Sequence, residues 1–188
     1  EFFGKAVDLF MVESDRYAKS EIKTLNILKA GSIPVIDGRL DEILWKNALP
    51  DYFVSASKKF SEPIKDKSRT SVQAVWTKNG VTFGCHMEED EIIKIVTNAV
   101  KHDKNVWADD CIEIFISLEN DNQNYYQIVV NAKGVIFDGY SKEKNFTDWD
   151  AEKLKTKTYI GKNFWSLEVY IPFSSFKNNS DTILSGTK

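Results

Sequence analysis

Residues 105–116 read NVWADDCIEIFI and place a tryptophan and three carboxylic acids within a few positions of one another. The tryptophan is Trp107, and the last of the acids, Glu113, stands in the middle of an alternating apolar segment. Carboxylates accept hydrogen bonds from hydroxyl groups, and an indole ring packs on the apolar face of a sugar. These residue types therefore indicate a site for a polyhydroxylated ligand.

The alternation of neighbouring residues predicts which side chains lie together. In CIEIFI the isoleucines occupy every second position, so they face the core and Glu113 faces outward. In the next segment, YYQIVVNA, Gln127 and Asn131 share one face. If the two segments form a regular hairpin, Glu113, Gln127 and Asn131 lie side by side on the outer face of a sheet, with Trp107 at its rim.

Short apolar or alternating segments recur along most of the chain. We expect strands at 70–77, 81–87, 111–118, 125–132, 134–141, 155–161 and 164–173, and a further short one at 35–36. Asn79-Gly80 is a strong hairpin signal. The chain shows no heptads, no long amphipathic helix and no βαβ alternation. This pattern predicts an all-β fold, an antiparallel, jelly-roll-like β-sandwich with one short helix near 41–48.

Asp37 and Asp41 flank the start of this helix, and we expect them to act as turn and N-cap residues. Alternation in 164–173 places Glu168 and Tyr170 on the outer face. The remaining tryptophans divide into two groups. Three of them are expected in the core: Trp45, Trp76 and Trp165. Trp149 lies in an acidic loop, where it is equally consistent with a second sugar platform and with a loop anchor.

Composition excludes several classes of protein. The chain has 188 residues, 42% hydrophobic and 28% charged, which is typical of a folded globular domain. The net charge of −3, with lysines and acids interspersed, argues against a nucleic-acid partner. No apolar stretch approaches the length of a transmembrane helix. Cys85 and Cys111 are expected on opposite faces of strands, so we expect no disulfide between them.

Four segments together resemble carbohydrate-binding module family 9. They are IPVIDGRLDEILW, SVQAVWTKNGVTFGCHM, VWADDCIEIFISLENDNQNYYQIVVNAKGVIFD and FWSLEVYIPFSSF, and the likeness extends over about residues 33–188. Members are β-sandwiches that are often attached to bacterial glycoside hydrolases. The resemblance implies that Trp107 is a platform tryptophan, Glu113 an acidic hydroxyl-binding residue and Asn131 a polar ligand. Val129 departs from the pattern, because sugar binders of the family carry a basic residue at that position.

The resemblance also implies the surroundings of the module. We expect a sugar-binding domain at 32–188, truncated at its C-terminal end before a second platform tryptophan. Residues 1–31 are either strands of the same sandwich or the end of a preceding domain. The expected ligand is a chain end of a plant-type polysaccharide, and the expected partner is a covalently linked catalytic domain. The expected location is extracellular, periplasmic or on the cell surface. Family members often carry calcium, and the oxygen-rich loops at 88–91 and 119–124, or Asp110, are candidate ligands without a diagnostic spacing.

Three alternatives remain. A glycosidase would need two carboxylates across a cleft, and Glu113 with Glu168, or Asp109 with Asp110, are the candidate pairs. Haem binding would need axial ligands, but His86 and Met87 are consecutive and face opposite ways on a strand. The third alternative is a structural accessory sandwich of a larger secreted enzyme, without sugar binding of its own.

Overall fold

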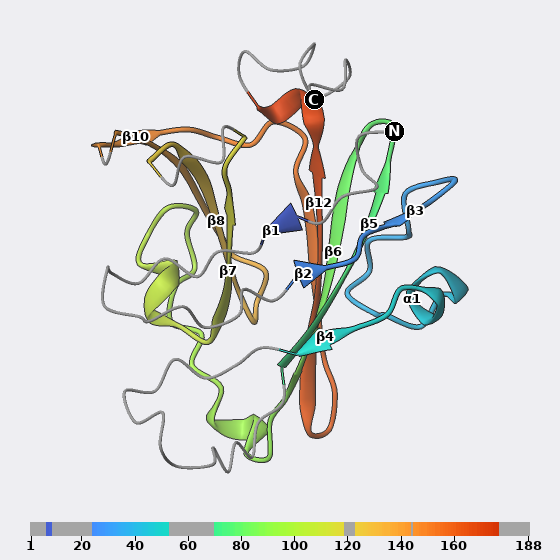
Figure 1. Cartoon of the computed structure of the whole chain (residues 1–188). Helices are drawn as coiled ribbons and strands as arrows, with labels where there is room; N and C mark the ends of the chain where they lie inside the picture. The colour runs from blue at the N-terminus through green and yellow to red at the C-terminus, as the bar shows by residue number, and fades with distance from the viewer. Residues whose placement is uncertain (1–6, 9–23, 53–69, 119–122, 144, 177–188) are drawn as a thin grey trace, which may run out of the picture.

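The computed structural model describes residues 7–8, 24–52, 70–118, 123–143 and 145–176, and nearly all of its regular structure is β-strand (Figure 1). The strands are β1 (Val7–Asp8), β2 (Thr24–Leu25), β3 (Leu28–Lys29), β4 (Asp51–Tyr52), β5 (Thr70–Thr77), β6 (Gly80–Glu88), β7 (Cys111–Ile116), β8 (Tyr125–Asn131), β9 (Ile136–Lys142), β10 (Asn145–Asp148), β11 (Lys155–Ile160) and β12 (Phe164–Pro172). One α-helix, α1 (Ile43–Asn47), and three 3₁₀ turns complete the described elements: η1 (Ile92–Lys94), η2 (Val106–Ala108) and η3 (Phe173–Ser175).

Two sheets form the layers of a sandwich. The four-stranded sheet has the order β10-β9-β8-β7, in which consecutive strands are neighbours. The six-stranded sheet has the order β11-β12-β6-β5-β3, with β4 also paired to β5. Figure 1 shows the two layers nearly edge-on, with β7 and β8 in one and β12, β6 and β5 in the other. The predicted antiparallel sandwich and its single short helix are therefore confirmed, although β3 pairs with β5 in parallel.

The main core lies between the sheets, where alternation predicted it. Ile112 and Ile114 of β7 and Ile128 and Val130 of β8 are buried in the same apolar cluster as Leu167 of β12. The hairpin at Asn79-Gly80 joins β5 to β6 as predicted, with Thr77 opposite Gly80. Burying these aliphatic side chains stabilises the fold by roughly 1.5–3 kcal/mol for each fully buried residue.

Residues before position 32 contribute to this sandwich. β3 forms an edge strand of the six-stranded sheet beside β5, and Leu25 of β2 is buried in the main core. β1 pairs with β2 in a small separate sheet. The chain between residues 24 and 31 thus packs as part of the sandwich.

Glu168 and Tyr170 face outward from the six-stranded sheet, as alternation predicted, but the expectation that they lie at the surface is wrong, because the segment 30–48 covers this face. Their exposed fractions are 0% and 6%. The row Gln73, Gly84 and Glu168 runs across β5, β6 and β12 beneath this segment. A Cβ at Gly84 would lie 2.7 Å from Leu40 and 3.1 Å from the Trp45 ring, so only glycine lets Trp45 pack there.

Glu168 holds the covering segment in place. Its carboxylate accepts hydrogen bonds from the backbone N–H groups of Asp37 and Gly38, both at 2.8 Å, and from the Trp45 indole at 2.9 Å. Burial raises the pKa of Glu168 above its usual value, against the opposing effect of these three donors. Glu168 is therefore an internal anchor of the fold.

Smaller predictions around α1 had mixed outcomes. Asp37 accepts a hydrogen bond from the N–H of Arg39 at 2.8 Å, which confirms its turn role. Asp41 is not the N-cap: that position is Glu42, which makes no side-chain capping bond. Residues 35–36 are not a strand. Trp45 is buried as expected, but it belongs to a second cluster outside the main core.

The other two tryptophans expected in the core differ in their burial. Trp165 is 5% exposed in the main core, as predicted. Trp76 is only half-buried and lies under the ammonium group of Lys29, so its assignment to the core is wrong. Cys85 and Cys111 are both free thiols. None of the helices in the described residues is long and apolar enough to span a bilayer.

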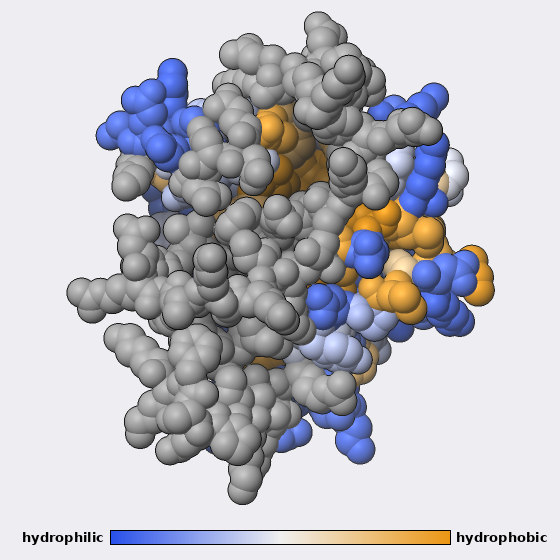
Figure 2. All heavy atoms as spheres, in the orientation of Figure 1, coloured by the Kyte–Doolittle hydropathy of each residue, from blue (hydrophilic) through white to orange (hydrophobic). Residues whose placement is uncertain are grey.

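Apolar side chains also reach the surface near α1, on the face shown in Figure 2. Val35, Ile43 and Leu49 are each more than two-thirds exposed. Single exposed apolar residues are common on globular proteins, so these three need no functional explanation.

Candidate functional site

The outer face of the four-stranded sheet carries the polar pair predicted from the sequence. Glu113 on β7 is exposed and lies diagonally across from Gln127 on β8, whose side chain is half-buried. The Gln127 amide donates a hydrogen bond to the Glu113 carboxylate at 2.8 Å. This bond fixes both side chains, and it leaves carboxylate and amide oxygens as acceptors for ligand hydroxyls.

Trp107 lies on η2, which packs against β7, β8 and β9 on the same face of the sheet. The preceding residue, Val106, is fully buried against Val129 in a small apolar cluster on the outer face. Trp107 itself is 50% exposed. Burial of Val106 therefore anchors the turn and leaves the neighbouring indole open to a ligand.

The loop that carries Trp107 is fastened to the sheet through Asp109. The Asp109 carboxylate accepts hydrogen bonds from the N–H groups of Asn98 and Ala99, both at 2.9 Å, and from the Asn131 amide at 2.8 Å. Burial alone would raise the pKa of Asp109, but these hydrogen bonds and the positive charge of Lys133 outweigh it and lower the pKa. Ionised Asp109 is therefore part of the structure of the loop.

Asn131 is on the predicted face but is not accessible. Its exposed fraction is 0%, because the loop around Ala99 covers it. Besides the bond to Asp109, its side chain accepts hydrogen bonds from the N–H groups of Lys133, at 3.1 Å, and Val135, at 2.8 Å. In this structure Asn131 joins the loop to the β8–β9 turn, and a ligand could reach it only if the loop moved.

Asp110 also stabilises the loop. Its carboxylate accepts a hydrogen bond from the N–H of Val96 at 2.6 Å. The backbone N–H of Asp110 in turn donates to the Val96 carbonyl at 3.0 Å. The two adjacent aspartates thus bind successive parts of the same loop.

Trp149 is buried, contrary to the expectation that it could form an exposed platform. Its exposed fraction is 4%, and its indole N–H donates to the Ser175 carbonyl at 3.1 Å. Its ring packs against Tyr126 and Phe176 in the main core. This placement fits the other reading of Trp149, that of a loop anchor.

Two phenylalanines near Trp107 were not among the predicted site residues. Phe137 on β9 meets Trp107 edge-on, with ring centroids 5.1 Å apart, and stacks on Phe146 at 5.6 Å. Phe146 is 48% exposed and lies over Gly139, where a Cβ would come within 2.3 Å of its ring. Phe137 could have been found from alternation, since it lies opposite Val129. Phe146 lies in a short strand without an apolar pattern.

The candidate glycosidase pairs are not arranged as catalytic pairs. Glu113 lies on the outer face of one sheet and Glu168 on the outer face of the other, so the whole core separates them. Asp109 and Asp110 are both engaged by backbone N–H groups. Neither pair spans an open cleft with room for a sugar and a water molecule.

The loops suggested for calcium do not form a ligand cage where the structure describes them. In 88–91, Glu89 accepts a hydrogen bond from the N–H of Glu91, and Glu91 pairs with Lys94 at 2.6 Å. In 119–124, residues 119–122 lie outside the described residues. A different group is found near the start of β9: His102, Asp103, Asp138 and Asp150.

Comparison with curated proteins finds a relative among xylanases. The chain is 27% identical over 158 residues to endo-1,4-beta-xylanase A of Thermoanaerobacterium saccharolyticum. The match covers 80% of this chain but only 12% of the xylanase. The chain thus spans about one eighth of the length of that relative.

Solved structures of similar fold include two with carbohydrate-related descriptions. A carbohydrate-binding module of family 9 from Caldicellulosiruptor kristjanssonii, in complex with cellotriose, has a TM-score of 0.57 at 18% identity, covering 79% of this chain and 67% of that one. A Bacteroides uniformis protein to which carbohydrate binding is attributed has a TM-score of 0.64 at 19% identity, covering 80% and 72%. These likenesses show a shared fold.

The family assignment comes from the sequence profile named "Carbohydrate family 9 binding domain-like", which matches residues 36–186. This range includes Trp107, Glu113 and Gln127 and most of both sheets. The chain therefore belongs to the carbohydrate family 9 binding domain-like family.

Proposed function

We propose that this chain is a non-catalytic module that binds carbohydrate on the outer face of its four-stranded sheet. The observation that carries this function is the half-exposed Trp107 on the same sheet face as the hydrogen-bonded pair Glu113 and Gln127. A ring face and a fixed pair of acceptors are the two elements that sugar recognition needs. Membership of the family supports the same conclusion.

The ligand class follows from the relatives. One structural neighbour holds cellotriose and another structure of a module from the same organism holds glucose. The xylanase relative acts on a β-1,4-linked xylan, as its name states. A chain end of a β-1,4-linked plant polysaccharide is therefore the proposed ligand. A covalently linked glycoside hydrolase, located outside the cytoplasm or on the cell surface, is the proposed partner.

One specific observation favours a second candidate, a structural sandwich that binds no sugar. Asn131 is completely buried, and Val129 beside it is also 0% exposed. Of the three polar residues predicted on this face, only Glu113 and Gln127 remain accessible. A module with so few accessible polar groups could serve as a spacer within a larger enzyme.

Isothermal titration calorimetry with cellotriose, xylotriose and glucose separates the two candidates. We expect saturable binding of at least one of these sugars, and we expect Trp107→Ala to weaken it about fivefold or more, because a stacking contact contributes on the order of 1 kcal/mol or more. Glu113→Ala should weaken binding as well, without a large change in stability, since this side chain is exposed.

Tyr52→Ala is the matched control. Tyr52 is an exposed aromatic residue, at 43%, on β4 of the other sheet, and we expect its substitution to leave binding unchanged. Absence of heat with all three sugars for the unsubstituted protein would support the structural candidate instead. Release of reducing ends from the same oligosaccharides would contradict the non-catalytic assignment.

A further inference from the structure

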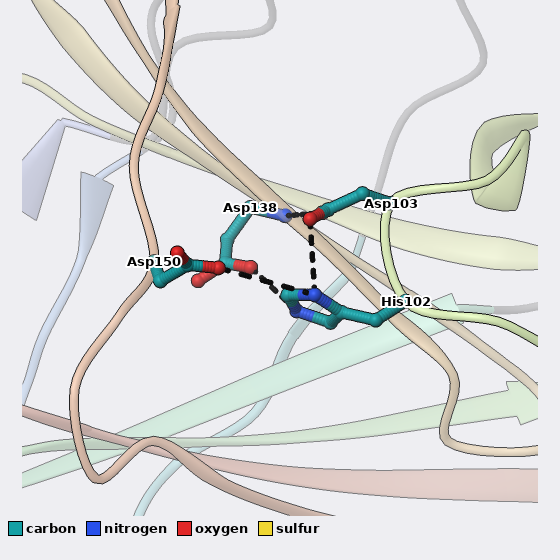
Figure 3. A group of neighbouring side chains, drawn as sticks. All are labelled: His102, Asp103, Asp138 and Asp150. Carbon is teal, nitrogen blue, oxygen red and sulfur yellow. Dashed lines mark hydrogen bonds and ion pairs between the residues drawn. The ribbon is translucent and has the colours of Figure 1, made fainter.

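Four ionisable side chains converge near the start of β9, away from the Glu113–Gln127 pair. They come from three segments: His102 and Asp103 from the loop before η2, Asp138 from β9, and Asp150 from the turn after β10 (Figure 3). One ligand atom from each lies within 4.8 Å of every other. Figure 3 shows the carboxylates directed at the two nitrogens of one imidazole.

The distances place the imidazole between the acids. His102 Nε2 lies 2.8 Å from Asp138 Oδ1, and His102 Nδ1 lies 3.0 Å from Asp103 Oδ2 and 4.0 Å from Asp150 Oδ1. When all three carboxylates are ionised, they leave two uncompensated negative charges even beside a protonated imidazole. No lysine or arginine of the described segments pairs with any of these carboxylates. A divalent cation would neutralise this excess charge.

The buried carboxylate supplies a second observation. The Asp138 side chain is 4% exposed, and it extends to the core side of β9, opposite Ile128. Its Oδ2 accepts a hydrogen bond from the N–H of Ala151. Its Oδ1 is buried and accepts no hydrogen bond from the described residues, although His102 Nε2 lies at ion-pair distance. A buried carboxylate oxygen needs a cationic partner, and the imidazole at 2.8 Å supplies at most one positive charge for three carboxylates.

We propose that His102, Asp103, Asp138 and Asp150 bind one divalent metal ion of the Zn²⁺ or Mn²⁺ type. Metal–ligand bonds of about 2.0–2.2 Å keep ligand atoms within about 4.4 Å of each other, so a small inward rotation of the side chains completes the site. An imidazole nitrogen is a good ligand for these ions and a poor one for Ca²⁺, which takes oxygen ligands.

The site joins segments that are far apart in the sequence. Asp103 N–H donates to the Ile136 carbonyl at 3.0 Å, and the N–H of Asp138 donates to Asp103 Oδ1 at 3.3 Å. A bound ion would strengthen this attachment of the 97–108 loop to β9 and to the turn at Asp150. The metal is therefore structural and fixes the loop that carries Trp107.

The test uses tag-free protein that has been treated with a chelator and dialysed. Titration calorimetry with ZnCl₂, MnCl₂ and CaCl₂, each alone, measures stoichiometry and affinity, and thermal unfolding measures the stabilisation. We expect one Zn²⁺ or Mn²⁺ per chain and a rise of the unfolding midpoint by about 5 °C or more at saturating metal.

Variants assign the ion to these residues. Asp150→Asn and His102→Gln should each weaken metal binding at least tenfold, and Asp150 is 81% exposed, so its substitution should leave the fold intact. Glu152→Gln is the matched control, an exposed acid two positions from Asp150 that is not part of the group. It should bind metal like the unsubstituted protein.

The proposal is overturned if none of the three cations binds, or if Asp150→Asn and His102→Gln bind as tightly as the unsubstituted chain. Tighter binding of Ca²⁺ than of Zn²⁺ and Mn²⁺, unaffected by His102→Gln, would also overturn it. In that case the imidazole would be a partner of the carboxylates and not a ligand.

Discussion

The two glutamates in the middle of β7 and β12 show how the surroundings of a side chain determine its role. Each stands on the outer face of its sheet in an alternating strand. Glu113 is exposed and paired with Gln127, whereas Glu168 is completely buried and accepts three hydrogen bonds from the segment that covers it. An exposed carboxylate can exchange water for ligand hydroxyls. The buried Glu168 carboxylate already accepts hydrogen bonds from the protein.

Glu168→Gln should destabilise the protein by about 2 kcal/mol or more. The amide that replaces one carboxylate oxygen donates, so it would face either the Trp45 indole or the N–H groups of Asp37 and Gly38 without an acceptor. Urea unfolding of both proteins gives the difference in the free energy of unfolding at neutral pH. A difference near zero would show that these three hydrogen bonds do not hold the covering segment.

The same pair of proteins has a predictable pH dependence. Because the folded-state pKa of Glu168 is raised, the folded protein binds more protons than the unfolded one between the two pKa values. The contribution of Glu168 to stability is then fully present below its unfolded pKa of about 4.3 and declines as pH rises through the folded pKa. The stability difference from Glu168→Gln should therefore be larger at pH 4 than at pH 7.

The loop between η1 and β7 shapes the proposed binding site on the outer face of the four-stranded sheet. It covers Val129 and Asn131 with its own apolar residues and presents Trp107 at its surface. Its attachments are the carboxylates of Asp109 and Asp110, which bind its backbone. A loop fixed in this way holds the ring in place before a ligand arrives, which reduces the entropic cost of binding.

Asp109→Asn should loosen this loop and weaken sugar binding. An asparagine keeps one acceptor oxygen, so at least one of the N–H groups of Asn98 and Ala99, or the Asn131 amide, loses its partner. Hydrogen exchange should show faster exchange at the Asn98 and Ala99 amides. Unchanged exchange at both amides would mean that Asp109 does not hold the loop.

Since the pKa of Asp109 is lowered in the folded protein, its contribution to stability is present above its unfolded pKa of about 3.9 and is lost as pH falls through the folded pKa. The stability difference between the unsubstituted protein and Asp109→Asn should accordingly be full at pH 7 and shrink as pH falls below about 4.

Alternation along a strand predicted which face each side chain occupies, but not whether that face is covered. Alternation placed Ile112 and Ile114 in the core and Glu113 outside, because those positions depend only on the period of their own strand. It did not predict that Glu168 and Asn131 are buried. Their burial depends on segments more than 20 residues away, which fold back over the outer faces. The period of a strand identifies a face but not what covers it.

The aromatic residues follow the same rule. Trp165 lies in phase with the apolar residues of a long strand, and its burial was predicted correctly. Trp149 stands in a polar loop without periodicity, and only the packing of Tyr126 and Phe176 around it decides that it is buried. The three aspartates around His102 come from three separate segments, so no local spacing in the sequence could have predicted that they lie together.

For the whole molecule, the two sheets form one core, and they should unfold together. Leu167 on β12 and Ile128 on β8 are both 0% exposed and belong to the same cluster, one from each sheet. Leu167→Ala should lower the free energy of unfolding by about 2–5 kcal/mol, through lost burial and the cavity that remains. Circular dichroism and tryptophan fluorescence should give the same transition midpoint, and two separate midpoints would contradict a single cooperative unit.

The two outer faces of the molecule differ in what covers them. The six-stranded sheet is covered by the segment 30–48, anchored by Trp45 and Glu168, while the four-stranded sheet is only partly covered and keeps Glu113 and Trp107 accessible. A ligand therefore has one open sheet face available among the described residues, and this is the face on which we propose that the sugar binds.

Nuclear magnetic resonance of the indole N–H groups tests this assignment most directly. The chain has five tryptophans, and each gives a separate signal. On titration with cellotriose or xylotriose, the signal of Trp107 and the side-chain amide of Gln127 should shift, while those of the buried Trp45, Trp149 and Trp165 stay in place. Shifts confined to Trp76 on the other sheet or to Trp45 on α1, or no shift of Trp107 at saturating sugar, would contradict a binding site on the four-stranded sheet.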